Sequence, residues 1–220
     1  MRENFSPRNR SKLTFSHHSL QCYFNYFWFY SSTRLQHNKT NGELFTMIHY
    51  PCNKLMIFGR PGSGKSTYAY KVHQATGLPV HHLDRCFFTK NWQQRNTQEF
   101  LAIQQEIVNQ PQWIIDGNCI KSLEMRYQHA DVCLYFNYSR LICYFRLLQR
   151  RFWHKSPAPK DRPKGCKEHI SWRLLKYMWD FEKRVEHIIQ HLKEKYPYVT
   201  FIEINNEQQL IQLQEQGCIP

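Results

Sequence analysis

From residue 54 onward, the sequence alternates between short apolar runs and longer stretches in which apolar residues recur every three or four positions. Uninterrupted apolar runs of a few residues are typical of strands that are buried on both faces of a parallel sheet. We therefore expect five strands, at residues 54–58, 79–83, 113–115, 132–136 and 198–202.

The longer stretches predict helices. Phe100, Ile103 and Ile107, for example, recur at helical spacing, and Pro111 ends that pattern. Strands that alternate with helices indicate an α/β fold, in which helices cover both faces of a parallel sheet and ligands bind at the carboxyl ends of the strands. Helices are expected at residues 67–75, 97–109, 139–153, 169–195 and about 206–216.

The aromatic residues of these elements divide into two groups. One group lies at strand or helix spacing and is predicted to belong to the core, namely Trp113, Trp172, Trp179 and Phe181. The other group follows the second predicted strand, where a ring could either stack on a ligand or pack against its neighbours, namely Phe87, Phe88 and Trp92.

The first 46 residues do not share this pattern. They are rich in Ser and Asn, and their aromatic run at residues 22–30 is too short for the ~20 residues that span a bilayer. We therefore interpret residues 1–46 as an N-terminal extension that is disordered or results from a mis-assigned start, with Met47 as the native start. Residues 47–220 then form a single domain, and we expect no association with a membrane.

Residues 59–67 read Gly-Arg-Pro-Gly-Ser-Gly-Lys-Ser-Thr, which matches the Walker A motif G-x-x-x-x-G-K-[ST]. Glycines let backbone N–H groups close around an anion, and the helix that follows presents its unpaired N–H groups to the same phosphates. Lys65 can neutralise the β- and γ-phosphates, and the Ser66 hydroxyl can bind Mg²⁺. The motif therefore predicts ATP binding by Gly59, Pro61, Gly62, Ser63, Gly64, Lys65, Ser66 and Thr67.

Two predicted strands are followed by an aspartate. Asp84 follows the second strand and Asp116 the third, so both are expected at the edge of the sheet that carries the Walker A loop. Asp116 suits the Mg²⁺ shell, with capping of the next helix as the alternative. Asp84 is expected to face the phosphate acceptor, where it would take a proton from a hydroxyl or position a phosphate; an ordinary turn residue is the alternative.

Charge and cysteine content narrow the class of protein. The chain carries 30 Lys and Arg against 17 Asp and Glu, a formal net charge of +13, which fits a nucleic-acid surface or cations around nucleotide phosphates. The basic residues are spread widely and are densest at 146–151 and 155–167, which favours the phosphate site. The eight cysteines form no C-x-x-C pair and no metal-ligand spacing, so we expect reduced thiols in a cytoplasmic protein.

Further motifs carry a resemblance to a family. Residues 82–84 (His-Leu-Asp), 113–118 (Trp-Ile-Ile-Asp-Gly-Asn), Arg126, 130–131 (Ala-Asp) and 146–151 (Arg-Leu-Leu-Gln-Arg-Arg) together resemble the adenylate-kinase-like DNA topology modulation proteins. The resemblance covers about residues 53–205. It implies a P-loop NTPase fold of the nucleoside-monophosphate-kinase type, a three-layer sandwich around a five-stranded parallel sheet. It also implies a short lid at about 154–167 and an acceptor-binding segment at about 85–110.

The resemblance also implies roles for single residues. Arg146 and Arg150 match arginines that touch the transferring phosphates in adenylate kinases; they share a helix face, and a solvated basic face is the alternative. Arg126 is implied as a clamp on an anion of the acceptor, with a surface position nearly as consistent. The implied acceptor-binding residues are Asp84, Asp116, Asn118 and Arg126.

These observations predict a kinase that transfers the γ-phosphoryl group of ATP to a small acceptor, with Mg²⁺ held by Ser66 and Asp116. A nucleoside monophosphate is the first candidate acceptor and a hydroxyl-bearing metabolite the second. The alternative function is an ATP-binding, nucleic-acid-associated regulator without turnover, a partner class that the charge distribution does not favour. The acceptor and the oligomeric state stay open at this point. The predicted catalytic residues are Lys65, Arg146, Arg150 and Asp84.

Overall fold

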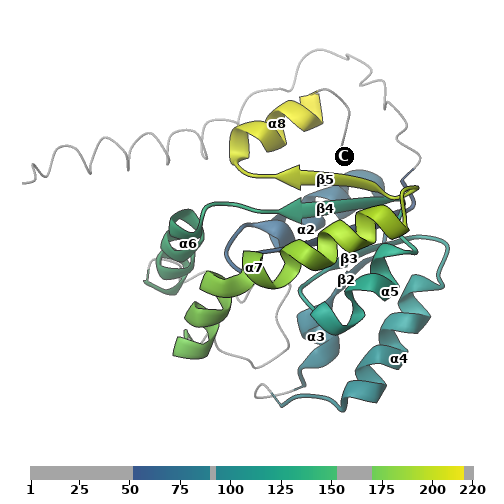
Figure 1. Ribbon diagram of the computed structural model, residues 1–220, viewed down its shortest axis with the longest axis horizontal. Coiled ribbons are helices and arrows are strands. Elements are labelled where there is room, and N and C mark those ends of the chain that lie inside the picture. The colour runs from purple at the N-terminus through teal and green to yellow at the C-terminus, as the bar shows by residue number, and fades with distance from the viewer. Residues whose placement is uncertain (1–51, 90–92, 153–169, 216–220) are drawn as a thin grey trace, which may run out of the picture. The chain divides into compact units, whose positions relative to one another are not determined.

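The computed structural model describes residues 52–89, 93–152 and 170–215, which belong to one compact unit, Ile48–Pro220 (Figure 1). The predictions for residues 1–46 and for the lid at 154–167 lie outside the described residues. Within the described ranges, no helix has both the length and the apolar character that a membrane span requires.

Five parallel strands form the sheet, as the sequence predicts. Their order is β2-β3-β1-β4-β5, and every neighbouring pair is parallel. Crossover connections through helices place the carboxyl ends of all five strands at one edge of the sheet. The bounds of the strands are β1 Lys54–Gly59, β2 Val80–His82, β3 Trp113–Asp116, β4 Val132–Phe136 and β5 Thr200–Ile204.

The last strand begins two residues later than predicted. Tyr198 is 66% exposed and its hydroxyl donates to the Gln128 carbonyl, while Val199 N–H closes a turn onto the Tyr196 carbonyl. The sequence at 198–199 has strand-forming residues, but this turn holds them outside the sheet. Pairing with β4 therefore starts at Thr200, opposite Val132.

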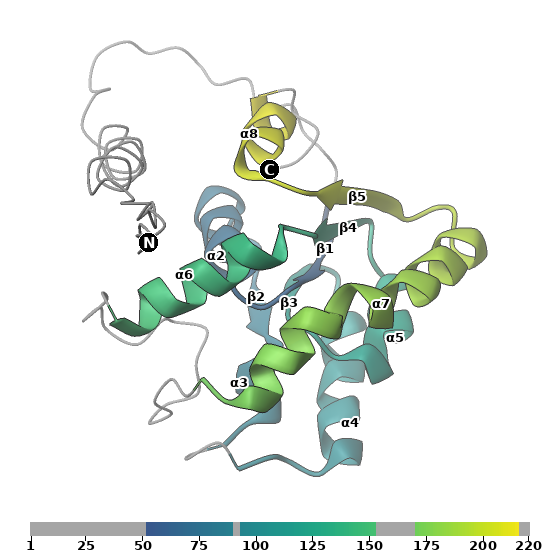
Figure 2. The ribbon, with the colours of Figure 1, turned by 60° about the vertical axis from the view of Figure 1, so that its left-hand side comes forward.

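Helices cover both faces of the sheet (Figure 2). Side chains of β1 alternate, so that Met56 and Phe58 enter the core under α4, α5 and α7, whereas Leu55 and Ile57 face α2, α6 and α8. All four are at most 1% exposed, and the burial of each is worth roughly 1.5–3 kcal/mol. The helices are α2 Lys65–Thr76, α3 Leu83–Phe87, α4 Thr97–Val108, the 3₁₀ turn η2 Ile120–Ser122, α5 Leu123–Tyr127, α6 Arg140–Phe152, α7 Trp172–Lys195 and α8 Glu207–Glu215.

Local sequence explains where the long helices begin and end. Asn96 caps α4 by accepting a hydrogen bond from the Gln98 N–H at 2.8 Å, and Ser171 caps α7 through the Leu174 N–H at 3.2 Å. Gly77 ends α2 in the left-handed conformation, with its N–H on the His73 carbonyl. These caps agree with the helices expected from the apolar spacing.

The predicted aromatic core is half right. Trp113 and Phe181 are at most 1% exposed, but Trp172 is 86% and Trp179 is 52% exposed. The 24-residue helix α7 buries a stripe of Met178, Phe181, Val185, Ile189 and Leu192, and the two exposed tryptophans lie off that stripe. The core prediction is therefore wrong for Trp172 and Trp179. Trp179 instead lies under the Arg140 guanidinium, 5.0 Å from its ring centre.

Candidate functional site

The Walker A loop forms a backbone cradle between β1 and α2. Gly62 (φ +84°) and Gly64 (φ +96°) adopt conformations that favour glycine. A Cβ at Gly62 would lie 2.6 Å from the Cys143 carbonyl oxygen, so the loop fits closely under α6. The first turn of α2 has no side-chain cap and no acidic residue, so its N–H groups are available to an anion. Lys65 and Ser66, both half-buried, open that turn.

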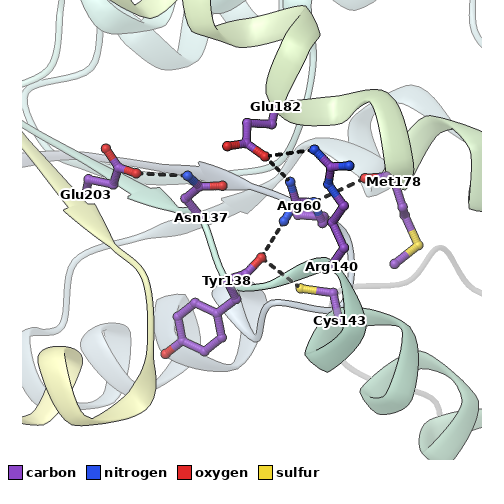
Figure 3. Close-up of polar contacts among 8 residues, drawn as sticks. All are labelled: Arg60, Asn137, Tyr138, Arg140, Cys143, Met178, Glu182 and Glu203. Carbon is purple, nitrogen blue, oxygen red and sulfur yellow. Dashed lines mark hydrogen bonds and ion pairs between the residues drawn. The ribbon is translucent and has the colours of Figure 1, made fainter.

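Arg60 anchors this loop to helix α7 and to the segment between β4 and α6 (Figure 3). The side chain is 2% exposed, and its Nε donates to the Met178 carbonyl at 3.1 Å while Nη1 donates to the Tyr138 carbonyl. Its Nη2 pairs with Glu182 Oε2 at 3.1 Å, and the same oxygen binds Arg140 at 3.3 Å. Arg60 occupies a variable position of the motif, so spacing alone gave no signal of this role.

Arg146 lies at the rim of the cradle, as the predicted role requires. Its Nη1 donates to the Ser63 carbonyl at 3.0 Å, and its Nη2 pairs with Glu207 Oε2 at 3.2 Å. The guanidinium also covers the Tyr138 ring at 5.0 Å. Arg150 lies one turn further along α6 and is half-buried. The structure therefore brings Arg146 to the Walker A loop and places Arg150 on the same side of α6.

Asp116 ends β3 beside Ile57 of β1 and His82 of β2. Its Oδ2 accepts a hydrogen bond from His82 Nδ1 at 2.9 Å, and both residues are buried. Its Oδ1 is also buried, yet it has no hydrogen-bond partner among the described residues. A buried carboxylate oxygen without a partner costs free energy, so its persistence indicates a polar ligand.

The donors at this place fit Mg²⁺. Hard cations prefer carboxylate and hydroxyl oxygens, which Asp116 Oδ1 and the Ser66 hydroxyl supply beside the phosphate cradle. The two residues follow neighbouring strands, β3 and β1, at the same edge of the sheet. The sequence predicts Asp116 and Ser66 as ligands of Mg²⁺, but it indicates no role for His82. The pairing of His82 with Asp116 becomes apparent only from the register of β2 and β3.

Asn118 holds the end of β3 against the start of the Walker A loop. Its Nδ2 donates to the Gly59 carbonyl at 2.6 Å, and its Oδ1 accepts from the Gly59 N–H at 3.0 Å. Both the nitrogen and the oxygen of the amide take part in this pair. In the structure Asn118 therefore supports the nucleotide loop, a contact different from the predicted one with the acceptor.

Arg126 lies in the interior rather than in the acceptor site. It is 0% exposed, and its three nitrogens donate to the carbonyls of Ser122 at 3.2 Å, Gly117 at 3.1 Å and Cys119 at 2.8 Å. Burial lowers the pKa of Arg126 to about 10, which leaves it charged at neutral pH. The structure thus corrects the predicted clamp on the acceptor, because this guanidinium already binds the loop that follows β3.

Asp84 is exposed in the first turn of α3, immediately after β2. Burial, with the Asp84 charge as a smaller contribution, raises the pKa of Tyr177 on α7 to about 12, so the two residues are electrostatic neighbours. Arg184 lies over the Tyr177 ring at 5.8 Å. Among the aromatics of this segment, Phe87 packs against Phe88 and Phe100 with ring centres 4.7 and 4.8 Å apart.

The sheet order, the glycine cradle after the central strand and the aspartate at the end of β3 are those of an α/β fold of the P-loop NTPase type. Packing, and not only the motif, therefore supports the Walker A assignment. Most of the predicted site residues belong to the carboxyl edge of the sheet or to the elements that leave it. They are Asp84, Asp116, Arg146 and the residues of the Walker A loop.

Two solved structures resemble this one. A shikimate kinase from Acinetobacter baumannii, in complex with shikimate, is 14% identical, with a TM-score of 0.49 over 78% of this chain and 98% of that one. A gluconokinase from Sinorhizobium meliloti 1021 is 13% identical, with a TM-score of 0.43 over 74% of this chain and 94% of that one. Neither substrate transfers to this chain at such identities.

No protein-family model and no curated protein matches the sequence. The resemblance to DNA topology modulation proteins therefore rests on the motifs alone.

Proposed function

We propose that the chain is an ATP-dependent kinase that transfers the γ-phosphoryl group of ATP, with Mg²⁺, to a small acceptor. The observation that carries this proposal is the buried Oδ1 of Asp116, which has no hydrogen-bond partner in the described part of the chain. It lies one strand away from a glycine cradle, and the helix that follows the cradle has no side-chain cap. An anion-binding loop and an unpaired carboxylate oxygen together suit a nucleotide with its metal ion.

Each side chain has a defined task in this proposal. Lys65 neutralises charge on the β- and γ-phosphates, and Arg146, with Arg150 one turn away, stabilises charge on the transferring group. Ser66 and Asp116 would hold Mg²⁺, which when bound withdraws charge from the phosphate oxygens. The peptide N–H groups of the loop orient the nucleotide without moving, because Arg60 and Asn118 fix the loop from either side.

The geometry favours a hydroxyl acceptor over a nucleoside monophosphate. An acceptor phosphate would approach the Asp84 carboxylate, while the implied counter-charge, Arg126, is already bound to three carbonyls. Like charges at close range cost energy, whereas a hydroxyl gains a proton acceptor. We therefore propose that the acceptor oxygen attacks the γ-phosphorus as the bond to the bridging oxygen of ADP breaks, and that Asp84 takes the hydroxyl proton.

An acceptor screen tests this function. ADP release is measured with Mg²⁺–ATP and two panels, one of polyols and hydroxy acids and one of nucleoside monophosphates. We expect turnover with a member of the first panel and its loss in Lys65→Ala. Asp84→Asn should bind ATP normally but lower kcat by roughly 10²–10⁴-fold, because it cannot accept the proton. Transfer to nucleoside monophosphates alone would overturn the acceptor class, and ATP binding without any transfer would overturn the kinase.

A further inference from the structure

The pair formed by His82 and Asp116 is not explained by the Walker A motif. The two residues are partners in the parallel register of β2 and β3, so their side chains project from the same face of the sheet. His82 Nδ1 lies 2.9 Å from Asp116 Oδ2, and the side chains are 5% and 4% exposed. Two polar groups this deeply buried need partners, and each satisfies the other at one atom.

The contact leaves the two oxygens of Asp116 in different states. Oδ2 is bound to the imidazole, while Oδ1 is buried and has no partner among the described residues. A carboxylate that is bound at one oxygen cannot rotate freely, so Oδ1 keeps one direction.

We infer that His82 is a positioning residue, which holds Asp116 so that Oδ1 stays free for the metal ion of the bound nucleotide. This inference rests on the proposed function. Partners that orient a metal-binding carboxylate typically change metal affinity or activity by roughly 10–100-fold when they are removed. The effect belongs to the uptake of Mg²⁺, whereas the phosphate cradle, which His82 does not touch, should keep its affinity for ATP without the metal.

The neighbouring residue supplies a matched control. His81 precedes His82 in β2, so its side chain projects from the opposite face of the sheet. Its Nε2 is buried, and within the described residues it has no hydrogen bond, to Asp116 or to any other group. In the register of the sheet, His81 lies opposite Ile115 and not opposite Asp116. His81→Asn therefore makes the same chemical change in the same strand without touching the carboxylate.

The test compares three variants by calorimetry with ATP, with and without Mg²⁺, and by the Mg²⁺ concentration that gives half-maximal turnover. In His82→Phe we expect this concentration to rise roughly 10–100-fold, with metal-free ATP binding unchanged. His82→Asn should recover most of the loss, because its amide places an N–H near the position of Nδ1. His81→Asn should behave like the wild type in both measurements.

Three outcomes contradict the role of His82. They are an unchanged Mg²⁺ requirement in His82→Phe, an equal loss of metal-free ATP binding, and a His82→Asn variant as impaired as His82→Phe. Thermal melting identifies a variant that does not fold. If His82→Phe does not fold, His82→Ala takes its place: a raised Mg²⁺ requirement in the folded variant supports the role, and a wild-type requirement overturns it. Failure of the wild type to bind Mg²⁺–ATP would instead refute the proposed function.

Discussion

A methyl group has no room at Gly59, the last residue of β1. Its Cβ would lie 2.3 Å from the Phe136 carbonyl oxygen, and its φ of +149° is one that L side chains rarely adopt. Gly77, at the end of α2, has a positive φ of +76° but nothing within 4 Å of an added Cβ. A side chain at Gly59 would meet both a steric clash and backbone strain, whereas one at Gly77 would meet backbone strain alone. Comparing the two positions therefore separates the two effects.

We expect Gly59→Ala to lower the free energy of unfolding by roughly 3 kcal/mol or more, because strain and a backbone clash add. Gly77→Ala should cost about 1–2 kcal/mol, the conformational penalty alone. Unfolding in denaturant measures both values. Equal losses in the two variants would show that β4 yields to the methyl group and that Gly59 is not sterically required.

His81 predicts a pH dependence of stability. Burial, and then the charge of His82, lowers the pKa of His81 below its ordinary value of about 6.5. As the pH falls, the unfolded chain therefore binds a proton at His81 before the folded chain does. The contribution of neutral His81 to the free energy of unfolding is complete above about pH 6.5 and is lost as the pH falls through the pKa of the folded state.

The measurement is unfolding in denaturant between pH 5 and 8, on the wild type and His81→Gln. The wild type should lose stability on acidification more steeply than the variant. Parallel curves would contradict the prediction, because they would mean that His81 titrates equally in both states.

Much of the nucleotide site could be predicted from the sequence, because the Walker A motif consists of residues that are close together in the chain. The glycines, Lys65 and Ser66 stand at fixed spacings, and their order alone specifies a loop followed by a helix. The role of a residue whose partners are far away in the sequence could not be predicted in this way. Arg60 meets Met178 across 118 residues, and nothing near either residue indicates the pair.

Among the elements, α7 links the core to the nucleotide loop through Arg60. Its buried stripe packs on the sheet, while its Met178 carbonyl and Glu182 carboxylate hold Arg60. Glu182 also holds Arg140 at the start of α6, so one carboxylate joins three elements (Figure 3). The position of the loop therefore depends on a helix that begins more than a hundred residues later.

We expect Glu182→Gln to lower the free energy of unfolding by roughly 1–3 kcal/mol, because the buried Arg60 loses its charged partner. The KM for ATP should rise with it, since the loop is less firmly held. Glu99→Gln is the control, because its pair with Arg95 is exposed and is worth roughly 0.5 kcal/mol or less. A Glu182→Gln variant as stable as Glu99→Gln would contradict the anchoring role.

Element types were predictable wherever burial was complete. The strand at Val132–Phe136 matches its prediction, since all five residues are buried and the run has no alternative period. The short helices α3 and α5 were not predicted, because five residues are too few for a helical pattern to appear. Arg126, which was predicted as a clamp on the acceptor, lies in α5, and this unpredicted helix places it in the interior.

At the scale of the whole molecule, the net charge and the sheet topology both bear on phosphate binding. The chain carries a formal net charge of +13, and parallel strands collect their carboxyl ends where the Walker A loop lies. A positive potential attracts polyanions in general, so the net charge alone is consistent with binding either ATP or nucleic acid. The proposed function favours ATP, because a backbone cradle at one place suits the phosphates of a single nucleotide.

The central claim is that this cradle holds the phosphates of ATP. The most direct measurement is isothermal calorimetry of the full chain with ATP and Mg²⁺, beside Lys65→Ala. We expect stoichiometric binding by the wild type and at least roughly a 10-fold loss of affinity in Lys65→Ala, since each 1.4 kcal/mol of lost phosphate interaction is tenfold. A wild type that takes up no Mg²⁺–ATP, or a Lys65→Ala variant that binds it equally well, would contradict the account.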